Sequence, residues 1–160
     1  MKNQTFAAVS AAAVLGLTAI VPVPALAEDK SAATISVSEK EPVGRYLADS
    51  EGLSLYMLEA DTQGVGGTEA VSTCSDKCTE EWPPLTTSGE PQAGEQLDAS
   101  LLSSIEREDG SMQVTYNGWP LYHYHDDKES GDMSGQDVHD DWGGWYLVSP
   151  SGEKNEGKAD

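Results

Sequence analysis

The chain has 160 residues, with 28 Asp or Glu against 9 Lys or Arg, and a formal net charge of −19 at pH 7. A surface of this charge repels the phosphates of nucleic acids and of anionic lipids, so neither is an expected partner. The acidic residues are scattered, and two interpretations of them stay open: adaptation to a saline medium, where salt screens the repulsion, or capture of cations.

The first 27 residues (1–27) have the pattern of a secretory signal peptide. Lys2 provides a positive start, residues 7–21 form an apolar stretch, and Ala25-Leu26-Ala27 offers a small-residue cleavage site. The apolar stretch is short for a membrane span of about 20 residues, and no Cys follows it that would accept a lipid. We therefore expect cleavage after Ala27, a periplasmic or secreted location, and no stable membrane insertion after processing.

The chain beyond the signal is long enough for one modest core, so a single domain is expected. Residues 28–42 are polar and rich in Ser and Ala, which predicts a mobile arm before a β domain over residues 43–149. Residues 43–49 and 53–59 are extended runs on either side of Gly52, and this pattern predicts a hairpin.

Cys74 and Cys78 are the two cysteines, and both lie in the expected exported part. In an oxidising compartment this spacing favours a disulfide, and a helix over residues 72–82 would place the two residues one turn apart, within bonding reach. Thr73 is the expected cap of that helix. So short a loop contributes about 2 kcal/mol to stability by chain entropy. A metal–thiolate site is the alternative.

The second half of the chain predicts a three-stranded meander. Residues 104–108, 112–116 and 119–125 are extended runs. The dipeptides Asp109-Gly110 and Asn117-Gly118 separate them, and both favour tight hairpin turns. No stretch is long or periodic enough for a major helix, so the fold class is all-β with one or two short helices. The remaining expectations are a Gly-rich loop at residues 62–70, a loop at 86–96, a brief helix capped by Asp98, an acidic loop at 126–141, a last strand at 145–148 and a disordered tail at 150–160.

The two halves repeat one hairpin. Tyr56 and Tyr122 differ by 66 in number, and the same offset aligns a turn glycine, a leucine and a closing aspartate in each half. We therefore expect two related hairpin or meander repeats, at about residues 43–84 and 104–149. The further aligned pairs are Gly52 with Gly118, Leu55 with Leu121 and Asp61 with Asp127.

Strand alternation predicts which side chains form the core. Tyr122 and Tyr124 share one face of the second hairpin, and Tyr56 and Leu58 take the same places in the first. Together with three tryptophans they are the expected core, and an aromatic ligand groove is the alternative. The tryptophans are Trp82, Trp119 and Trp145.

Asp61 and Asp127 each end a hairpin and enter a loop. A carboxylate in that place commonly accepts backbone N–H groups and shapes the exit turn. The alternative is an active site of paired carboxylates, which requires the two to converge. The sequence contains no nucleophile elbow, zinc-protease motif, P-loop or dinucleotide fingerprint, so we expect that the protein is not an enzyme.

These residues resemble a known family of bacterial secreted repeats and predicted lipoproteins. Its Y-x-[FWY]-x-x-D signature is similar to Tyr122-x-Tyr124-x-x-Asp127 and, with a leucine in the aromatic place, to Tyr56-x-Leu58-x-x-Asp61. The C-x-x-x-C and Trp-Pro-Pro segments look similar to that family as well. The resemblance covers about residues 44–152 and implies an extracytoplasmic repeat domain. The family has no assigned activity, so the resemblance supplies no catalytic residues, and the missing lipobox Cys implies a soluble form.

The three histidines, His123, His125 and His139, lie close together in the sequence. On a strand, His123 and His125 would point to one face, and imidazole with carboxylate suits copper or zinc. The alternative is a polar face that happens to carry histidines. Two function classes follow: an exported, non-catalytic binding or interaction module of the bacterial cell envelope with an envelope protein as partner, or a periplasmic copper- or zinc-binding protein that uses these three histidines.

Overall fold

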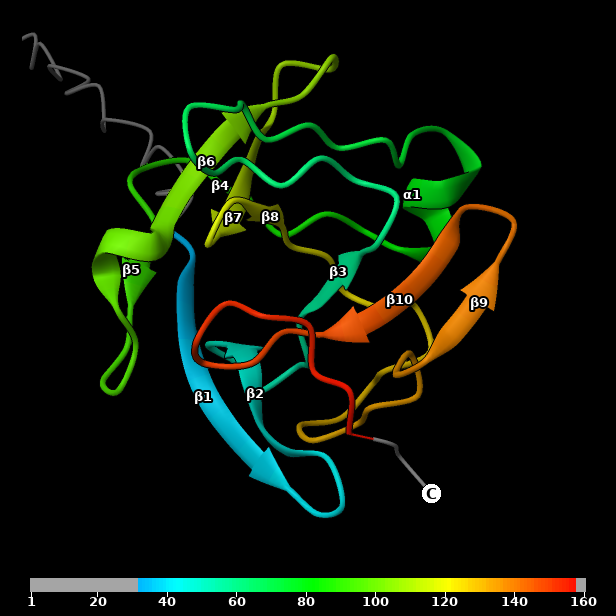
Figure 1. The fold of residues 1–160 in the computed structure, drawn as a ribbon. Coiled ribbons are helices and arrows are strands. Elements are labelled where there is room, and N and C mark those ends of the chain that lie inside the picture. The colour runs from blue at the N-terminus through cyan, green and yellow to red at the C-terminus, as the bar shows by residue number, and fades with distance from the viewer. Residues whose placement is uncertain (1–31, 158–160) are drawn as a thin grey trace, which may run out of the picture.

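The computed structural model describes residues 32–157 (Figure 1), so the expected signal peptide and its cleavage site lie outside the described residues. Within that range the protein consists of short strands, a one-turn α-helix and a 3-10 turn, which confirms the all-β fold class. The elements are β1 (Thr34–Lys40), β2 (Gly44–Asp49), β3 (Tyr56–Leu58), α1 (Lys77–Glu81), β4 (Thr86–Thr87), β5 (Gln92–Ala93), η1 (Ala99–Leu101), β6 (Leu102–Glu106), β7 (Met112–Tyr116), β8 (Trp119–Pro120), β9 (Val138–Asp140) and β10 (Gly143–Leu147).

The described strands form three small sheets. One has the order β2-β1-β5, a second the order β3-β10-β9, and the third the order β4-β7-β6, with β8 also paired to β7. Figure 1 shows the β1–β2 hairpin at one end of the molecule and β6 with β7 at the other, with β3 and β10 between them. The sheet that contains β3 and β10 therefore joins the two ends.

The first predicted hairpin is present, with a shorter second strand than expected. The backbone N–H of Asp49 donates to the carbonyl of Leu53 at 3.0 Å, and Gly52 in the turn has a φ of 86°. The N–H of Leu55 still donates to the carbonyl of Leu47 at 3.0 Å, and beyond Leu55 the chain leaves β2 and β3 pairs with β10. The hairpin therefore places Tyr56 in the central sheet.

The predicted meander is formed by β6, β7 and β8. Asn117 and Gly118 have φ values of 48° and 76°, which is the backbone of a tight two-residue hairpin turn. The third run is shorter than the expected residues 119–125 and bonds to β7 only as far as Leu121, whose N–H donates to the carbonyl of Val114 at 3.0 Å. From there on, the backbone bonds alternately to residues 81–85 and to Tyr56, because it passes between two segments of the first half.

The segment expected to be a mobile arm contains β1. Ile35 is fully buried, and the strand pairs with the whole of β2, from Ile35 opposite Asp49 to Lys40 opposite Gly44. The prediction of an arm for this part was wrong because polar composition does not reveal a strand that inserts one apolar side chain and otherwise gains backbone hydrogen bonds.

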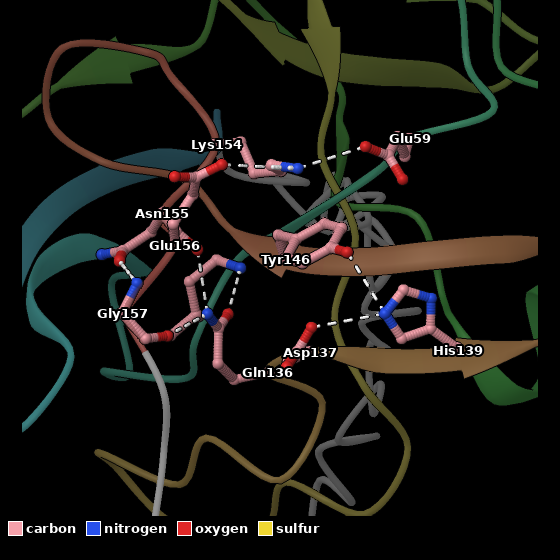
Figure 2. Close-up of polar contacts among 10 residues, drawn as sticks. Glu59, Gln136, Asp137, His139, Tyr146, Lys154, Asn155, Glu156 and Gly157 are labelled. Carbon is pink, nitrogen blue, oxygen red and sulfur yellow. Dashed lines mark hydrogen bonds and ion pairs between the residues drawn. The ribbon is translucent and has the colours of Figure 1, made fainter.

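The expected disordered tail is ordered as far as residue 157. Val148 forms a β-bridge with Lys154, and the side-chain amide of Gln136 donates to the carbonyl of Asn155 at 2.9 Å. Figure 2 shows this amide beside Asn155 and Gly157. The acidic loop expected at 126–141 likewise includes β9 at its end. Both segments are held by contacts with parts of the chain that lie far away in sequence, which local composition does not report.

The two copies of the hairpin meet at Tyr56 and Tyr122. The backbone N–H of each tyrosine donates to the carbonyl of the other, both at 2.9 Å. Around this bridge, Gly64 N–H donates to the carbonyl of Gly118 at 2.9 Å, and Gly131 N–H donates to the carbonyl of Gly52 at 3.1 Å. Each turn glycine thus contacts the loop that follows the other copy, and the arrangement approaches two-fold symmetry.

Side chains pack into two clusters on opposite faces of this central bridge, as strand alternation requires. Tyr56 and Tyr122 belong to one cluster, and their neighbours Leu55 and Leu121 belong to the other. The first cluster is Val43, Tyr46, Tyr56, Leu58, Cys74, Cys78, Trp82, Tyr122, Met133, Trp145 and Leu147, and the second is Ile35, Leu47, Leu55, Met57, Leu85, Val114, Tyr116, Leu121, Tyr146 and Val148.

Candidate functional site

The tyrosines and aspartates of the repeated motif form two hydrogen bonds that cross between the copies. The hydroxyl of Tyr56 donates to Oδ2 of Asp127 at 2.6 Å, and the hydroxyl of Tyr122 donates to Oδ2 of Asp61 at 2.7 Å. All four side chains are buried. Because each bond takes its donor from one copy and its acceptor from the other, neither copy completes the motif alone.

The second oxygen of each carboxylate binds the loop that follows it. Oδ1 of Asp61 accepts from the backbone N–H of Thr73 at 2.7 Å, and Oδ1 of Asp127 accepts from the backbone N–H of Ser134 at 2.9 Å. Each aspartate therefore anchors the exit of its own hairpin and the tyrosine of the other hairpin. The structure places each carboxylate against a tyrosine rather than against the other carboxylate.

Burial decides the protonation of these groups. It raises the pKa of the Tyr56 and Tyr122 hydroxyls far above 10.0, and the adjacent carboxylates raise both pKa values further. Burial also raises the pKa of Asp61, against the hydrogen bonds from Thr73 and Tyr122 that lower it. The tyrosines are therefore fixed hydrogen-bond donors at neutral pH, and their place in the fold is structural.

Two tryptophans stack beside the Tyr56–Asp127 pair. The rings of Trp82 and Trp145 lie 4.0 Å apart at an angle of 5°, and the Nε1 of each donates to Oδ2 of Asp140 at 2.9 Å. Both rings are fully buried, whereas Trp119 is half-buried against the other cluster. Sequence reasoning missed Asp140. The sequence pattern that could have indicated Asp140 is Asp-Asp-Trp-Gly, which is typical of a turn. In this turn Oδ1 of Asp140 accepts from the N–H of Trp142.

The predicted disulfide between Cys74 and Cys78 is present, with the Cα atoms 5.3 Å apart. The helix that carries it is shorter than the expected residues 72–82 and covers one turn only. Thr73 is not its cap, because the backbone and hydroxyl of Thr73 both donate to Asp61. The disulfide therefore closes the segment that holds the carboxylate of the Tyr122–Asp61 pair.

The three histidines each face a different carboxylate. Nε2 of His123 lies 3.0 Å from Asp49, and Nε2 of His125 lies 3.2 Å from Asp126. Nε2 of His139 lies 3.3 Å from Asp137. Over residues 32–157 no group of three or more His, Cys, Asp or Glu gathers in a way that could hold a metal ion. The expected site of three converging histidines is therefore not formed in the described part of the chain.

Asp49 differs from the other histidine partners because its carboxylate is also bonded by the backbone. Oδ1 accepts from the N–H groups of Glu51 and Leu53 at 2.8 and 2.9 Å. Burial raises the pKa of Asp49, but the hydrogen bonds from His123 and from these two N–H groups outweigh burial and hold the pKa below 3.8. The carboxylate shapes the first hairpin turn and orients His123.

His139 lies at the edge of a polar seam that holds the C-terminal segment. Figure 2 shows the Tyr146 hydroxyl pointing at His139, with Nε2 at 3.2 Å, and Lys154 reaching toward Glu59. Nζ of Lys154 lies 3.2 Å from Glu59 and 4.4 Å from the centre of the Tyr146 ring. An ammonium over an aromatic face is attracted by the ring quadrupole. These contacts fasten residues 150–157 to β10.

Two clefts that share lining residues lie beside β6, and Arg107 lines one of them. The first has a volume of about 690 Å³ between residues 70–79 and 105–109, and the second has about 670 Å³ between residues 64–70 and the start of β6. Arg107 donates to Ser72 at 2.8 Å and to the carbonyl of Cys74 at 2.6 Å.

Arg107 connects the first cleft to the buried pair. Oγ of Ser72 accepts from Arg107 and lies 2.6 Å from the hydroxyl of Tyr122, which in turn donates to Asp61. The charge of Arg107 also lowers the pKa of Asp61. Sequence reasoning missed Arg107, although one of only two arginines in so acidic a chain is a signal that a carboxylate lies near it.

The fold and this site define a small all-β domain in which two hairpin copies are joined by crossed tyrosine–aspartate bonds. The sequence model of a family described as a secreted repeat of unknown function matches residues 103–148, which confirms the resemblance over the second copy. No curated protein and no solved structure matches the chain. In the described residues, no helix is both long and apolar enough to cross a membrane.

Proposed function

We propose that this protein is an exported, non-catalytic binding module of the bacterial cell envelope. The observation that carries the proposal is the pair of joined clefts beside β6, the first of which is connected to the buried Tyr122 through Arg107 and Ser72. Concave surfaces of this size, lined by both apolar and polar groups, are the usual places for ligands. The description of the matched family as secreted supports the export of the protein.

The buried motif supports a role without catalysis. A general acid or base must reach its substrate and must titrate near the working pH. Tyr56 and Tyr122 are buried, and burial raises their pKa values away from neutral pH. Both carboxylate oxygens of Asp61 and of Asp127 accept hydrogen bonds from donors inside the protein. These residues serve as a rigid support, on which the cleft walls are held.

Copper or zinc binding has weaker support. It requires His123, His125 and His139 to share an ion, and each of them instead lies beside a carboxylate of its own. Titration calorimetry with Cu(II) and Zn(II) separates the two functions. Saturable binding that is lost in His123→Ala or His125→Ala would favour the metal-binding protein over the interaction module.

The test of the binding module is photo-crosslinking in the cells that export the protein. A photoreactive phenylalanine derivative replaces Val71, which lies in the first cleft, and in a control protein it replaces Glu39, an exposed residue of β1. We expect a discrete adduct from the cleft position and none from the control. Adducts from neither position, or equally from both, would overturn the proposal, as would turnover of a substrate by the purified protein.

A further inference from the structure

β6 is an edge strand with one open side. In the register with β7, Ser104 lies opposite Val114. The backbone of Val114 is directed away from β6, since its N–H donates to Leu85 at 2.8 Å and its carbonyl accepts from Leu121 at 3.0 Å. In an antiparallel pair, the residue opposite such a position also directs its N–H and C=O outward. The N–H and C=O of Ser104 therefore face the open edge, where no described strand pairs with β6.

The same parity applies along the strand. Arg107 N–H donates to the carbonyl of Ser111 at 2.9 Å, and Asn117 N–H donates to the carbonyl of Leu101 at 2.8 Å. Odd-numbered residues of β6 thus bond to β7, and even-numbered residues are directed outward. An exposed row of unpaired backbone donors and acceptors is a template for another strand.

The two clefts meet beside β6 and form one groove, which reaches the open edge at Glu106. They share Ala70, Ile105 and Glu106 as lining residues. Val65 lines one cleft and Val71 the other, with exposed fractions of 45% and 49%. These are the two exposed large hydrophobic side chains in the described range. The apolar contacts of the groove therefore lie next to the open edge, whose backbone groups at Ser104 and Glu106 can bond an extended peptide.

The rim of the groove is acidic. Five exposed carboxylates line the two clefts, whereas the one cation there, Arg107, is already bonded to Ser72, Gln113 and Cys74. Five carboxylates against one arginine leave the lining of the groove with a net negative charge, so the groove attracts positive charge. The five acidic residues are Glu69, Asp76, Glu106, Glu108 and Asp109.

We propose that this groove binds an extended segment of a partner protein that alternates Lys or Arg with small apolar residues, and that the segment adds to β6 as an antiparallel or parallel strand. The inference rests on the proposed binding function and names the chemistry of its partner. Backbone bonds to Ser104 and Glu106 supply the register, and the apolar side chains lie against Val65 and Val71. The cationic side chains lie at the acidic rim. A second copy of this acidic chain is a poor occupant, because like charges would meet across the edge.

The test measures binding of a capped, fluorescent peptide of alternating lysine and valine to the purified protein by anisotropy at low salt. We expect saturable binding that weakens as salt is added, and no binding of the matched peptide of alternating glutamate and valine. Equal binding of both peptides would overturn the proposal. So would salt-independent self-association of the protein in sedimentation, because the edge would then serve a second copy.

Substitutions at Ser104 test whether β6 is the site. Ser104→Pro removes a donor that β7 does not use, so the sheet should survive while peptide affinity falls by about tenfold or more. Ser104→Val alters the side chain and keeps the N–H, and it should bind like the wild type. If Ser104→Pro fails to fold, a peptide methylated at alternate backbone nitrogens is used with the wild-type protein. Methylation removes the peptide's own N–H donors to β6, and the affinity should fall in the same way. Unchanged affinity in either experiment would overturn strand addition.

A matched pair of charge variants locates the cationic contacts. Glu106→Gln with Glu108→Gln should weaken the lysine peptide about tenfold, whereas Glu39→Gln with Glu41→Gln removes the same charge near the β1–β2 turn and should leave affinity unchanged. Equal effects of the two pairs would mean that net charge alone drives binding. If the peptide tests fail while the photo-adduct at the Val71 position still forms, the proposed binding function is supported. The proposal that the partner is a basic extended segment is then wrong.

Discussion

The two crossed tyrosine–aspartate pairs make the same hydrogen bond in different surroundings. Tyr56 is enclosed by aromatic rings: its ring centre lies 5.6 Å from Trp82 and 6.5 Å from Tyr124, and its hydroxyl accepts from the N–H of Gly135. Tyr122 packs against Trp145, at 5.2 Å between ring centres, and its hydroxyl lies 2.6 Å from Ser72, which leads through Arg107 to the first cleft. One pair is sealed inside the protein, and the other is connected to its surface.

The comparison distinguishes the residues that join the two copies from the residues around them, which can differ between the copies. The crossed bonds hold the two copies together, and they require only a tyrosine and an aspartate at matching places. Leu58 shows the freedom of the rest, since it is fully buried in the first copy where Tyr124 covers Trp82 in the second, at 4.2 Å between ring centres. The two copies therefore share the crossed bonds and differ in the side chains around them.

The largest effect that tests this comparison is expected from Tyr56→Ala. The substitution removes a fully buried ring and leaves Oδ2 of Asp127 without its donor, so the free energy of unfolding should fall by about 3–5 kcal/mol. Urea unfolding followed by tryptophan fluorescence measures the loss. A loss below about 1 kcal/mol would mean that the sealed pair does not hold the copies together.

Loss of the disulfide should lower the free energy of unfolding by about 2 kcal/mol, because Cys74–Cys78 closes a very short loop. This loop lies next to Thr73, which donates to Asp61 of the Tyr122–Asp61 pair. Cys78→Ser and reduced wild-type protein should lose the same free energy in urea unfolding. Both should still fold, and peptide binding at the first cleft should weaken in both. Wild-type binding in the reduced protein would show that the disulfide does not shape the cleft wall.

A subtler difference is expected between Tyr56→Phe and Tyr122→Phe. Removal of either hydroxyl takes one donor from a buried carboxylate, but Asp61 keeps two donors from Thr73 and the nearby charge of Arg107, whereas Asp127 keeps the N–H of Ser134. Tyr56→Phe should therefore cost about 1 kcal/mol more than Tyr122→Phe. Equal losses of unfolding free energy in the two variants would contradict the comparison.

The smallest effect is an alkaline loss of stability. Burial raises the pKa of both tyrosines above 10.0, so the folded state holds these protons more tightly than the unfolded state. The contribution of each tyrosine to the free energy of unfolding is complete below pH 10 and is lost as the pH rises above 10. At about pH 10.5 the loss is about 1 kcal/mol per tyrosine. Thermal midpoints between pH 8 and 11 measure it. The double variant Tyr56→Phe with Tyr122→Phe should show a shallower decline, and an unchanged slope would place the cause elsewhere.

Local patterns predicted those elements whose partners are adjacent in sequence. The Asn117-Gly118 turn and the meander around it follow from dipeptide preference and strand alternation, and the disulfide follows from spacing and compartment. The histidines were a misleading signal, because proximity in sequence placed His123 and His139 together while the fold gave each a different aspartate. The polar composition of residues 28–42 also did not indicate β1, which is held by pairing with β2 and by the single buried side chain of Ile35.

The sequence by itself determined that two similar hairpins exist, each with a tyrosine in the middle and an aspartate at the end, because these features depend on periodicity and turn chemistry within a few residues. Only the tertiary structure decided that Tyr56 bonds Asp127 and Tyr122 bonds Asp61, rather than each tyrosine bonding its own aspartate. The physical reason is that the choice of partner depends on how the two hairpins dock, through the backbone bridge between the tyrosines and the glycine contacts around it. The open edge of β6 has the same origin, since an edge is defined by which strands are absent from its side.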